Sequence, residues 1–204
     1  MKIAELNKLL GNIDIYLLDQ VLKGRFSTEM KILDAGCGEG RNAVYFIKEG
    51  FQLYGVDQNE TAIQYCRFIA KSLDKSYDSH RFQVAGLEEI PFHQEAFDAV
   101  ICSAVLHFAK DEANFWQMVN EMLRVLKPGG TLWFRMATAF GGIIEKSQVL
   151  CGGRFQLPDG SERFVLTQHH LDRMEEIGLK FLELPKSVLV HGQRAMGVFV
   201  MKKE

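Results

Sequence analysis

The chain has 204 residues, 47% of them hydrophobic and 25% charged, so it can bury one full core and is expected to form a single domain, 1–204. Its net charge of −2 gives no sign of a nucleic-acid partner, because polyphosphates select strongly basic surfaces. No charge-free apolar stretch is long enough to span a bilayer, and the N-terminus carries charges through its apolar part, so we expect a cytoplasmic protein without a membrane partner.

The N-terminal segment carries two helical patterns within residues 1–25 that break near Gly11. The second pattern has an apolar stripe typical of a helix that covers one face of a sheet, formed by Ile15, Leu17, Leu18, Val21 and Leu22. We therefore expect residues 1–30 to form a helical cap.

The stretch 31–41, KILDAGCGEGR, predicts a strand, a glycine loop and the start of a helix. Three glycines at alternate positions let the backbone turn sharply and let a ligand approach atoms that a Cβ would screen: Gly36, Gly38 and Gly40. A helix is expected over 41–48, with Gly50 as its C-terminal cap.

A dinucleotide site is one interpretation of this loop. The G-x-G-x-x-G fingerprint, however, would place its third glycine where Arg41 stands. The charge also disfavours a pyrophosphate, because Asp34 and Glu39 place two carboxylates beside the helix N-terminus. A ligand that is cationic near this loop fits better.

Strand and helix patterns then alternate along the chain, which predicts an α/β fold. The LKPGG segment, 126–130, is expected to stop a helix and turn the chain into the fifth strand. The later strands are expected at 52–56, 81–85, 97–102, 131–136, 180–190 and 195–201, and the later helices at 61–73, 112–126 and 168–177.

Asp57 directly follows the strand 52–56. Because adjacent parallel strands end at the same edge of a sheet, its carboxylate is expected where the ribose of a bound nucleoside would lie, beside the glycine loop. Its two oxygens can accept hydrogen bonds from both ribose hydroxyls. The alternative role, an N-cap for the helix that starts near Glu60, fits Asn59 better.

Residues 137–166 separate the fifth strand from the next helix and predict an insertion. Pro158, Asp159 and Gly160 make a turn between two short alternating runs, so a β-hairpin is expected. The segment has more apolar side chains than a loop needs: Phe140, Ile143, Phe155, Leu157 and Phe164. They suggest a lid over a small, partly apolar substrate, while a patch on the core or a dimer contact explains them equally well.

The glycine loop resembles the first motif of the class I S-adenosylmethionine-dependent methyltransferases, in which an acid precedes G-x-G-x-G. The matching residues are Asp34, Gly36, Gly38 and Gly40. Pro91 and Phe92 before the strand 97–102, and the LKPGG segment, are similar to later motifs of that family. The resemblance covers about 32–136. It implies a doubly wound, seven-stranded, mostly parallel sheet with helices on both faces and an antiparallel last strand.

The resemblance implies S-adenosyl-L-methionine as cofactor, whose sulfonium and ammonium groups suit the acidic loop. Asp34 would face the ammonium, and Leu87 with Glu88 would border the adenine. The acid that the family uses for the adenine amine falls here on Gly86, and Glu88 is near enough in sequence to replace it. The whole set implied to bind the cofactor is Asp34, Gly36, Cys37, Gly38, Arg41, Asn42, Asp57, Gln58, Leu87, Glu88, Cys102 and Ser103.

Two further residues enter through the same resemblance. Arg41 is a candidate partner for the cofactor's carboxylate, and a solvated helix residue is the comparable alternative. N-terminal helices of the family often close over the cofactor, which makes Tyr16 a candidate pocket residue.

The fourth strand ends in residues 102–105, CSAV, where methyltransferases of adenine or glutamine carry N/D-P-P-Y/F, and this difference argues against those substrates. His107 follows within reach of the same edge. A neutral imidazole there can take a proton from a hydroxyl or thiol nucleophile. Alternatively His107 packs beside Phe108 and shapes the pocket, because methyl transfer can run on proximity and alignment alone.

No metal site is expected. The adjacent His169 and His170 point about 100 degrees apart on a helix and are predicted to be surface or lid residues. Four cysteines without a C-x-x-C pair are predicted to be small buried side chains in a reducing compartment, a reactive Cys37 thiol being the alternative: Cys37, Cys66, Cys102 and Cys151.

The sequence thus predicts an enzyme that transfers a methyl group from S-adenosylmethionine to a small, partly apolar molecule. The glycine-loop spacing is also similar to tellurite-resistance and thiopurine-type methyltransferases, and the LKPGG region to quinone-biosynthesis methyltransferases. A non-catalytic S-adenosylmethionine-binding protein and a dinucleotide-dependent oxidoreductase are the alternatives from other classes. A protein acceptor also stays open.

Overall fold

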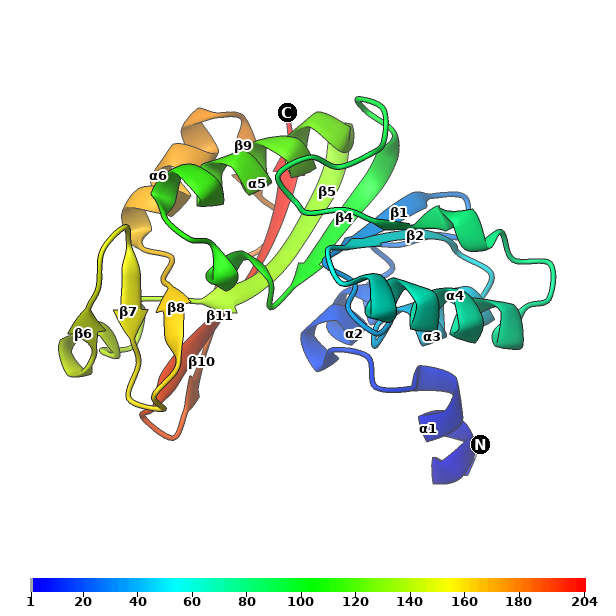
Figure 1. The fold of residues 1–204 in the computed structure, drawn as a ribbon, viewed down its shortest axis with the longest axis horizontal. Coiled ribbons are helices and arrows are strands. Elements are labelled where there is room, and N and C mark those ends of the chain that lie inside the picture. Colours follow the sequence, from blue (N-terminus) through cyan, green and yellow to red (C-terminus); the bar gives the residue numbers. More distant parts are fainter. Residues whose placement is uncertain (1) are drawn as a thin grey trace.

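The computed structural model describes residues 2–204, so the predicted start of the first helical pattern at Met1 lies outside the described residues. Within residues 2–204, eight strands form the central sheet in the order β10-β11-β5-β4-β1-β2-β3, with β9 also paired to β11 (Figure 1). The strands are β1 Lys31–Ala35, β2 Gln52–Asp57, β3 Phe82–Val84, β4 Phe97–Ser103, β5 Leu126–Ala137, β6 Gln148–Val149, β7 Arg154–Gln156, β8 Glu162–Phe164, β9 Leu179–Phe181, β10 Lys186–Val190 and β11 Arg194–Lys203.

The strand directions confirm the predicted topology. The pairs β1–β2, β1–β4, β2–β3 and β4–β5 are parallel, whereas β11 runs antiparallel to β5. β9 and β10 pair with opposite ends of β11, so they share one position at the edge of the sheet. The prediction of a single strand over 180–190 is wrong, because the chain breaks around Pro185, whose nitrogen carries no proton for a ladder hydrogen bond.

Helices cover both faces of the sheet (Figure 1). α5 and α6 contribute Phe115 and Leu171 to the core on one face, and α2, α3 and α4 contribute Leu17, Phe46 and Ile63 to the core on the other. The helices are α1 Ile3–Leu10, α2 Ile15–Leu22, α3 Ala43–Lys48, α4 Glu60–Leu73, α5 Glu112–Val125 and α6 Gln168–Glu176, with 3-10 helices η1 Ser79–Arg81, η2 Leu106–Phe108 and η3 Ile144–Lys146. Among the described residues, no helix has the length and apolar character needed to cross a membrane.

The LKPGG segment differs from its prediction. The fifth strand begins at Leu126 and not at Thr131, so the segment belongs to β5. Leu126 lies opposite Phe97 of β4, and Thr131 lies opposite Ala99, which leaves residues 127–130 as a bulge. The proline is tolerated because it stands in this bulge, outside the regular ladder.

The insertion after β5 forms a small sheet of its own, β6-β7-β8, drawn in yellow in Figure 1. β7 and β8 form the predicted hairpin, with the predicted turn, 158–160, between them. Ile143, Leu157 and Val165 of this region pack together with Ala195 of β11. The apolar side chains of the insertion therefore fasten it to the edge of the main sheet.

Two side-chain predictions are wrong. His170, predicted at the surface or in a lid, is only 5% exposed and packs against Phe115, Trp116 and Phe164, because its side of α6 turns toward the core. Cys151, predicted to be buried, is exposed, whereas the other three cysteines are buried as expected: Cys37, Cys66 and Cys102.

Candidate active site

A cavity of about 230 Å³ lies at the carboxyl ends of β1, β2 and β4, the edge at which open parallel sheets bind ligands. Its walls come from the glycine loop, the end of β2, the segment after β3, η2 and α5. The lining residues are Gly36, Asp57, Gln58, Gly86, Leu87, Glu88, Val105, Phe108, Lys110, Asn114 and Met118.

The glycine loop turns where the end of β1 meets the end of β4. Gly36 has a φ of +78°, and a Cβ on it would lie 2.4 Å from a methyl carbon of Val105. The N–H groups of Gly36 and Cys37 donate to the Val56 carbonyl at 2.8 and 3.0 Å. Gly38, with a φ of +52°, faces open space, since a Cβ there would meet no atom within 4 Å. Gly36 thus allows the close packing of the loop against Val105 and lines the cavity, whereas Gly38 has free space at its Cβ position outside the cavity lining.

Asp57 joins the end of β2 to the glycine loop. Its Oδ2 accepts the Gly38 N–H at 2.8 Å, and its Oδ1 accepts the Asn59 N–H at 2.9 Å. Asn59 caps α4 by accepting the Thr61 N–H at 3.0 Å, as its position in the sequence predicted. A carboxylate oxygen can accept more than one hydrogen bond, so both oxygens of Asp57 keep acceptor capacity at the cavity.

Asp34, at the end of β1, is a carboxylate that is 1% exposed. Neither of its oxygens has a hydrogen-bond partner within residues 2–204. Burial raises the pKa of Asp34 to about 7, against the opposing effects of the Arg41 charge and of the nearby Asn42 side chain. Because an unpaired ionised carboxylate is costly in the interior, this position suits a ligand that brings a positive charge.

The carboxylate of Glu88 lies beside Gly86. A Cβ built on Gly86 would lie 2.5 Å from Glu88 Oε2, so the carboxylate occupies the space beside that position. Glu88 Oε1 accepts from Asn114 Nδ2 at 2.9 Å, and this hydrogen bond lowers the pKa of Glu88. The group is therefore an ionised acceptor at the wall of the cavity near neutral pH.

Asp14 connects four elements around the site, and its role was missed in the sequence. It is 5% exposed, and its Oδ1 accepts the Tyr16 N–H at 3.0 Å as the N-cap of α2. Its Oδ2 accepts from Arg41 at 3.0 Å and from Arg135 of β5 at 3.1 Å. Arg41 also donates to Ser103 Oγ at 3.0 Å. An acid before the apolar stripe of α2 was the available signal, and it predicts the cap but not the ion pairs.

Some of the remaining predicted cofactor residues line the cavity, and others are buried away from it. Gln58 and Leu87 line the cavity. The side chains of Cys37 and Cys102 are instead buried in the two cores on opposite faces of the sheet. Contact with a neighbouring cysteine and burial raise the pKa of the Cys37 thiol, which disfavours the alternative of a reactive Cys37. Asn42 is buried, and its Oδ1 accepts the backbone N–H of the α2 N-cap at 3.0 Å.

His107 lies in η2 and is 6% exposed. Its Nδ1 accepts the Ala137 N–H at 3.3 Å, and this contact assigns the proton of the neutral ring to Nε2. Burial, followed by the charges of Arg163, Arg135 and Arg194, lowers the pKa of His107 to about 3. At neutral pH the ring is therefore an uncharged hydrogen-bond donor and a weak base.

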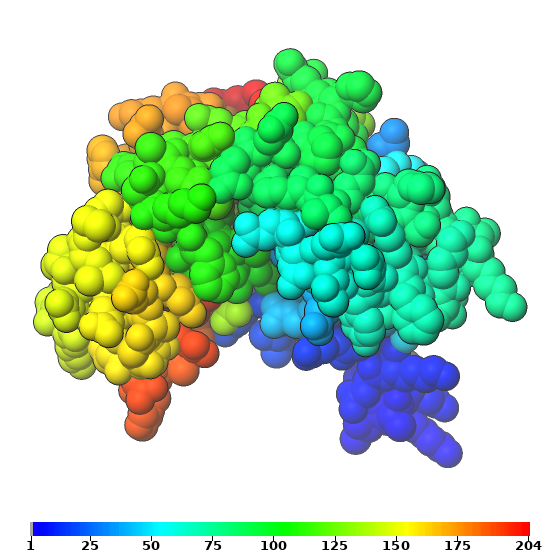
Figure 2. All heavy atoms as spheres, in the orientation of Figure 1, coloured from blue at the N-terminus to red at the C-terminus, as the bar shows by residue number. Residues whose placement is uncertain are grey.

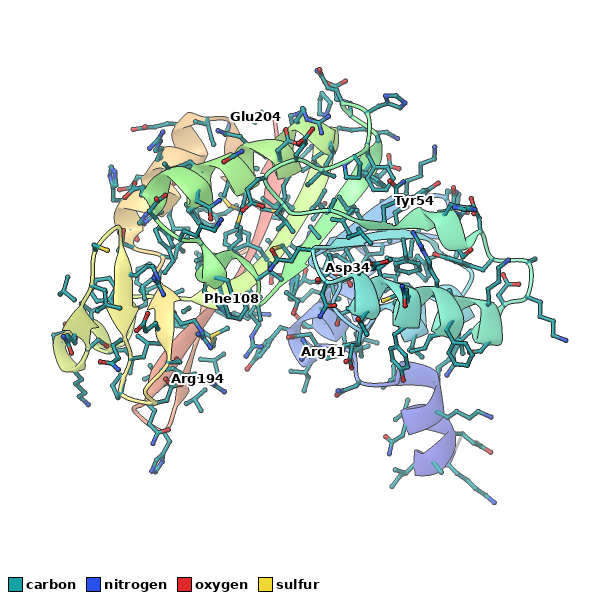
Figure 3. All side chains as sticks on the ribbon, in the orientation of Figure 1. Asp34, Arg41, Tyr54, Phe108, Arg194 and Glu204 are labelled. Carbon is teal, nitrogen blue, oxygen red and sulfur yellow. The ribbon has the colours of Figure 1, made fainter. Side chains whose placement is uncertain are left out.

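A second cavity, of about 250 Å³, lies beside the first, on the side of the insertion. Phe108 lines both cavities, and in Figure 3 it lies between Arg194 on one side and Asp34 and Arg41 on the other. Figure 2 shows a concave lower rim between the β10–β11 hairpin in orange and the N-terminal helices in blue. The second cavity is lined by Ala104, His107, Phe108, Arg135, Ala137, Leu157, Ser161, Arg163, Arg194 and Met196.

Comparison with known proteins identifies the family. A methyltransferase domain model matches residues 33–134, half of the chain. The protein therefore belongs to the S-adenosylmethionine-dependent methyltransferases, and the resemblance inferred from the glycine loop is confirmed.

Individual relatives are more distant. An uncharacterized protein of Haemophilus influenzae is 33% identical over 113 residues, 55% of this chain and 44% of that protein. A ubiquinone biosynthesis O-methyltransferase of Alkalilimnicola ehrlichii is 31% identical over 104 residues, 51% of this chain and 40% of that protein. The chain thus spans less than half the length of these relatives. The crystal structure of a SAM-dependent methyltransferase from Methanosarcina mazei shares the fold, with a TM-score of 0.69, 21% identity, and coverage of 90% of this chain and 96% of that one.

The contrast between the glycines gives a first prediction. Gly36→Ala is expected to lower the free energy of unfolding by about 2 to 3 kcal/mol, because the new Cβ would overlap Val105 at a positive φ. Gly160→Ala is the matched control, since Gly160 has a φ of +81° and open space at its Cβ position, and it should cost only about 1 kcal/mol. Urea unfolding of the three proteins measures both values, and equal losses would contradict the close approach at Gly36.

Asp34 gives a prediction for pH dependence. Its folded-state pKa of about 7 lies above the unfolded value near 3.9, so the folded protein holds its proton more tightly and loses stability as the pH rises through this range. Asp34→Asn has no such titration. Its free energy of unfolding, taken relative to the wild type at the same pH, should therefore be about 2 to 3 kcal/mol higher at pH 8 than at pH 5. Urea unfolding of the ligand-free proteins at both pH values tests this, and a gain independent of pH would contradict it.

Proposed function

We propose that the protein transfers a methyl group from S-adenosylmethionine to a small molecule that is bound in the second cavity. The observation that carries the proposal is a pair of acids that line the first cavity, Asp57 and Glu88, together with the buried Asp34 at the end of the neighbouring strand β1. Carboxylates can accept hydrogen bonds from the three donor groups of the cofactor, which are the ribose hydroxyls, the ammonium group and the adenine amine.

The residues present fit the cofactor at each of its parts. Asp57 offers one acceptor oxygen to each ribose hydroxyl while it still binds Gly38 and Asn59. Asp34 is a buried carboxylate without a partner in the described chain, and an ammonium group would remove its electrostatic cost. Glu88 Oε2, which lies beside Gly86, would accept from the adenine amine.

When bound, S-adenosylmethionine supplies a methyl group that its sulfonium sulfur makes electrophilic. The chain's own contribution is alignment and exclusion of water. Phe108 separates the two cavities and is placed to bring the acceptor and the cofactor end to end. The ion pairs of Asp14 with Arg41 and Arg135 hold α2, the glycine loop and β5 in a fixed relation around this point.

His107 is proposed to position the acceptor. Its Nε2–H can donate a hydrogen bond to an acceptor oxygen, sulfur or nitrogen in the second cavity. A general-base role, the sequence prediction, is the less favoured proposal, because a pKa of about 3 makes the ring a weak proton acceptor.

The class of acceptor is proposed from the second cavity. Leu157, Met196 and Phe108 give it apolar walls beside polar groups, which suits a small, partly apolar molecule. The relatives named as ubiquinone biosynthesis O-methyltransferases support a hydroxyl on such a molecule as one choice of nucleophile.

Calorimetric titration with S-adenosylmethionine, S-adenosylhomocysteine and NAD tests the proposed cofactor. The first two ligands should bind and NAD should not. Asp57→Ala should weaken binding of S-adenosylhomocysteine by about 1 to 3 kcal/mol, the cost of lost charge-assisted hydrogen bonds. Asp172→Ala, at an exposed carboxylate of α6, should leave it unchanged. Binding of NAD alone would contradict the proposal, and unchanged affinity in Asp57→Ala would remove the ribose role.

Glu88 allows a rescue experiment. Glu88→Ala should weaken S-adenosylhomocysteine binding about fivefold to tenfold, whereas Glu89→Ala, at the exposed neighbour, should not. Adding Gly86→Asp to Glu88→Ala returns a carboxylate to the same space and should restore part of the affinity. The same titrations measure these effects, and a failure of both the loss and the rescue would assign the adenine to another part of the cavity.

A further inference from the structure

The second cavity is unusually rich in guanidinium groups. Arg135 of β5, Arg163 of β8 and Arg194 at the start of β11 all line it, although they are far apart in the sequence. Figure 3 places Arg194 at the insertion side of Phe108. Three separate elements thus deliver positive charge to a cavity of about 250 Å³.

The carboxylates nearby leave this charge incompletely matched. Arg163 forms no ion pair among residues 2–204, and its Nη1 donates to the backbone carbonyl of Glu162 at 2.7 Å. Arg194 approaches Asp159 only to 3.6 Å. Arg135 shares its partner Asp14 with Arg41. The cavity therefore carries an excess of positive charge in its ligand-free form.

Two further groups in the cavity are hydrogen-bond donors, and an anion would supply acceptors for them. The Nε of Arg135 is buried without a hydrogen-bond partner in the described part of the chain. His107 presents an Nε2–H donor, and no carboxylate stands among the residues that line the cavity with it. The Arg163 guanidinium lies over the Phe108 ring, 4.8 Å from its centre, which holds this charge at the boundary with the first cavity.

We infer that the methyl acceptor is an anion, with a carboxylate or a phosphate group bound by Arg163 and Arg194 in the second cavity and with its nucleophilic atom directed past Phe108. Both groups present the oxygen pattern that the planar donors of arginine match. The apolar walls then hold the remainder of the molecule. This inference rests on the proposed methyltransferase function, because it assigns the acceptor side of the same site.

The experiment uses the full chain with ¹⁵N-labelled arginine, saturated with S-adenosylhomocysteine. Benzoate and phenyl phosphate are titrated as the two anionic probes and benzamide as the neutral one, with binding followed by NMR at the arginine Nε–H signals. At least one anion is expected to bind at least about tenfold more tightly than benzamide. The anion that binds with the higher affinity shows whether the site prefers a carboxylate or a phosphate. Added salt should weaken the binding of this anion.

Arg163→Gln and Arg194→Gln should each reduce the affinity of the preferred anion about tenfold or more, while binding of S-adenosylhomocysteine stays as in the wild type. Arg154→Gln is the matched control, because Arg154 lies in the same small sheet, pairs with Glu162 at 2.8 Å and does not line the cavity. It should leave anion binding unchanged.

The outcomes separate the two proposals. No preference for either anion over benzamide, or a preference that survives both arginine substitutions, would overturn the anionic acceptor while leaving the cofactor assignment intact. A protein that does not bind S-adenosylhomocysteine at all would instead defeat the methyltransferase proposal on which this inference rests.

Discussion

The contact between Gly36 and Val105 is the constraint on which the site depends. The glycine loop and the segment after β4 approach so closely that a Cβ on Gly36 would lie 2.4 Å from the valine side chain. Directly after β4, Ala104 has a φ of +62°. This conformation costs a non-glycine residue of the order of 1 to 3 kcal/mol. As a result η2 is held beside the loop, and Phe108 becomes a wall of both cavities.

Charge is distributed unequally around that wall. The first cavity is lined by the carboxylates of Asp57 and Glu88 and by Lys110, and the buried carboxylate of Asp34 lies at the end of the adjacent strand β1. The second cavity is lined by guanidinium groups. Burial is the larger cause of the lowered pKa of His107, and the charges of these arginines lower it further. Asp14 pairs with Arg135, which lines the second cavity, and with Arg41, which follows the glycine loop. This difference in charge underlies the proposals of a cofactor in the first cavity and an anionic acceptor in the second.

The central part of the fold was predictable because it depends on local patterns. The glycine loop, the strand before Asp57 and the cap at Asn59 are each encoded within a few residues. The same holds for the hairpin around 158–160. The predicted family followed from the loop, and its model match over residues 33–134 confirms it.

What the sequence did not reveal depends on distant contacts. The cluster of Arg135, Arg163 and Arg194 forms only when β5, the insertion and β11 pack together, so the spacing of these residues in the sequence does not predict it. The burial of His170 was missed because it depends on which side of α6 faces the aromatic core. Glu88 was considered for the place of an acid at Gly86 because the two are neighbours in the chain, but the position of its carboxylate follows from its hydrogen bond to Asn114.

A crystal structure of the protein with S-adenosylhomocysteine would show directly whether the cofactor occupies the first cavity. We expect the ribose hydroxyls on the two oxygens of Asp57, the adenine amine at Glu88, and the sulfur at the boundary formed by Phe108 between the cavities. The ammonium group should then face Asp34. A ligand bound elsewhere, or in the first cavity with its ribose away from Asp57 and its sulfur turned from Phe108, would contradict the proposed cofactor site.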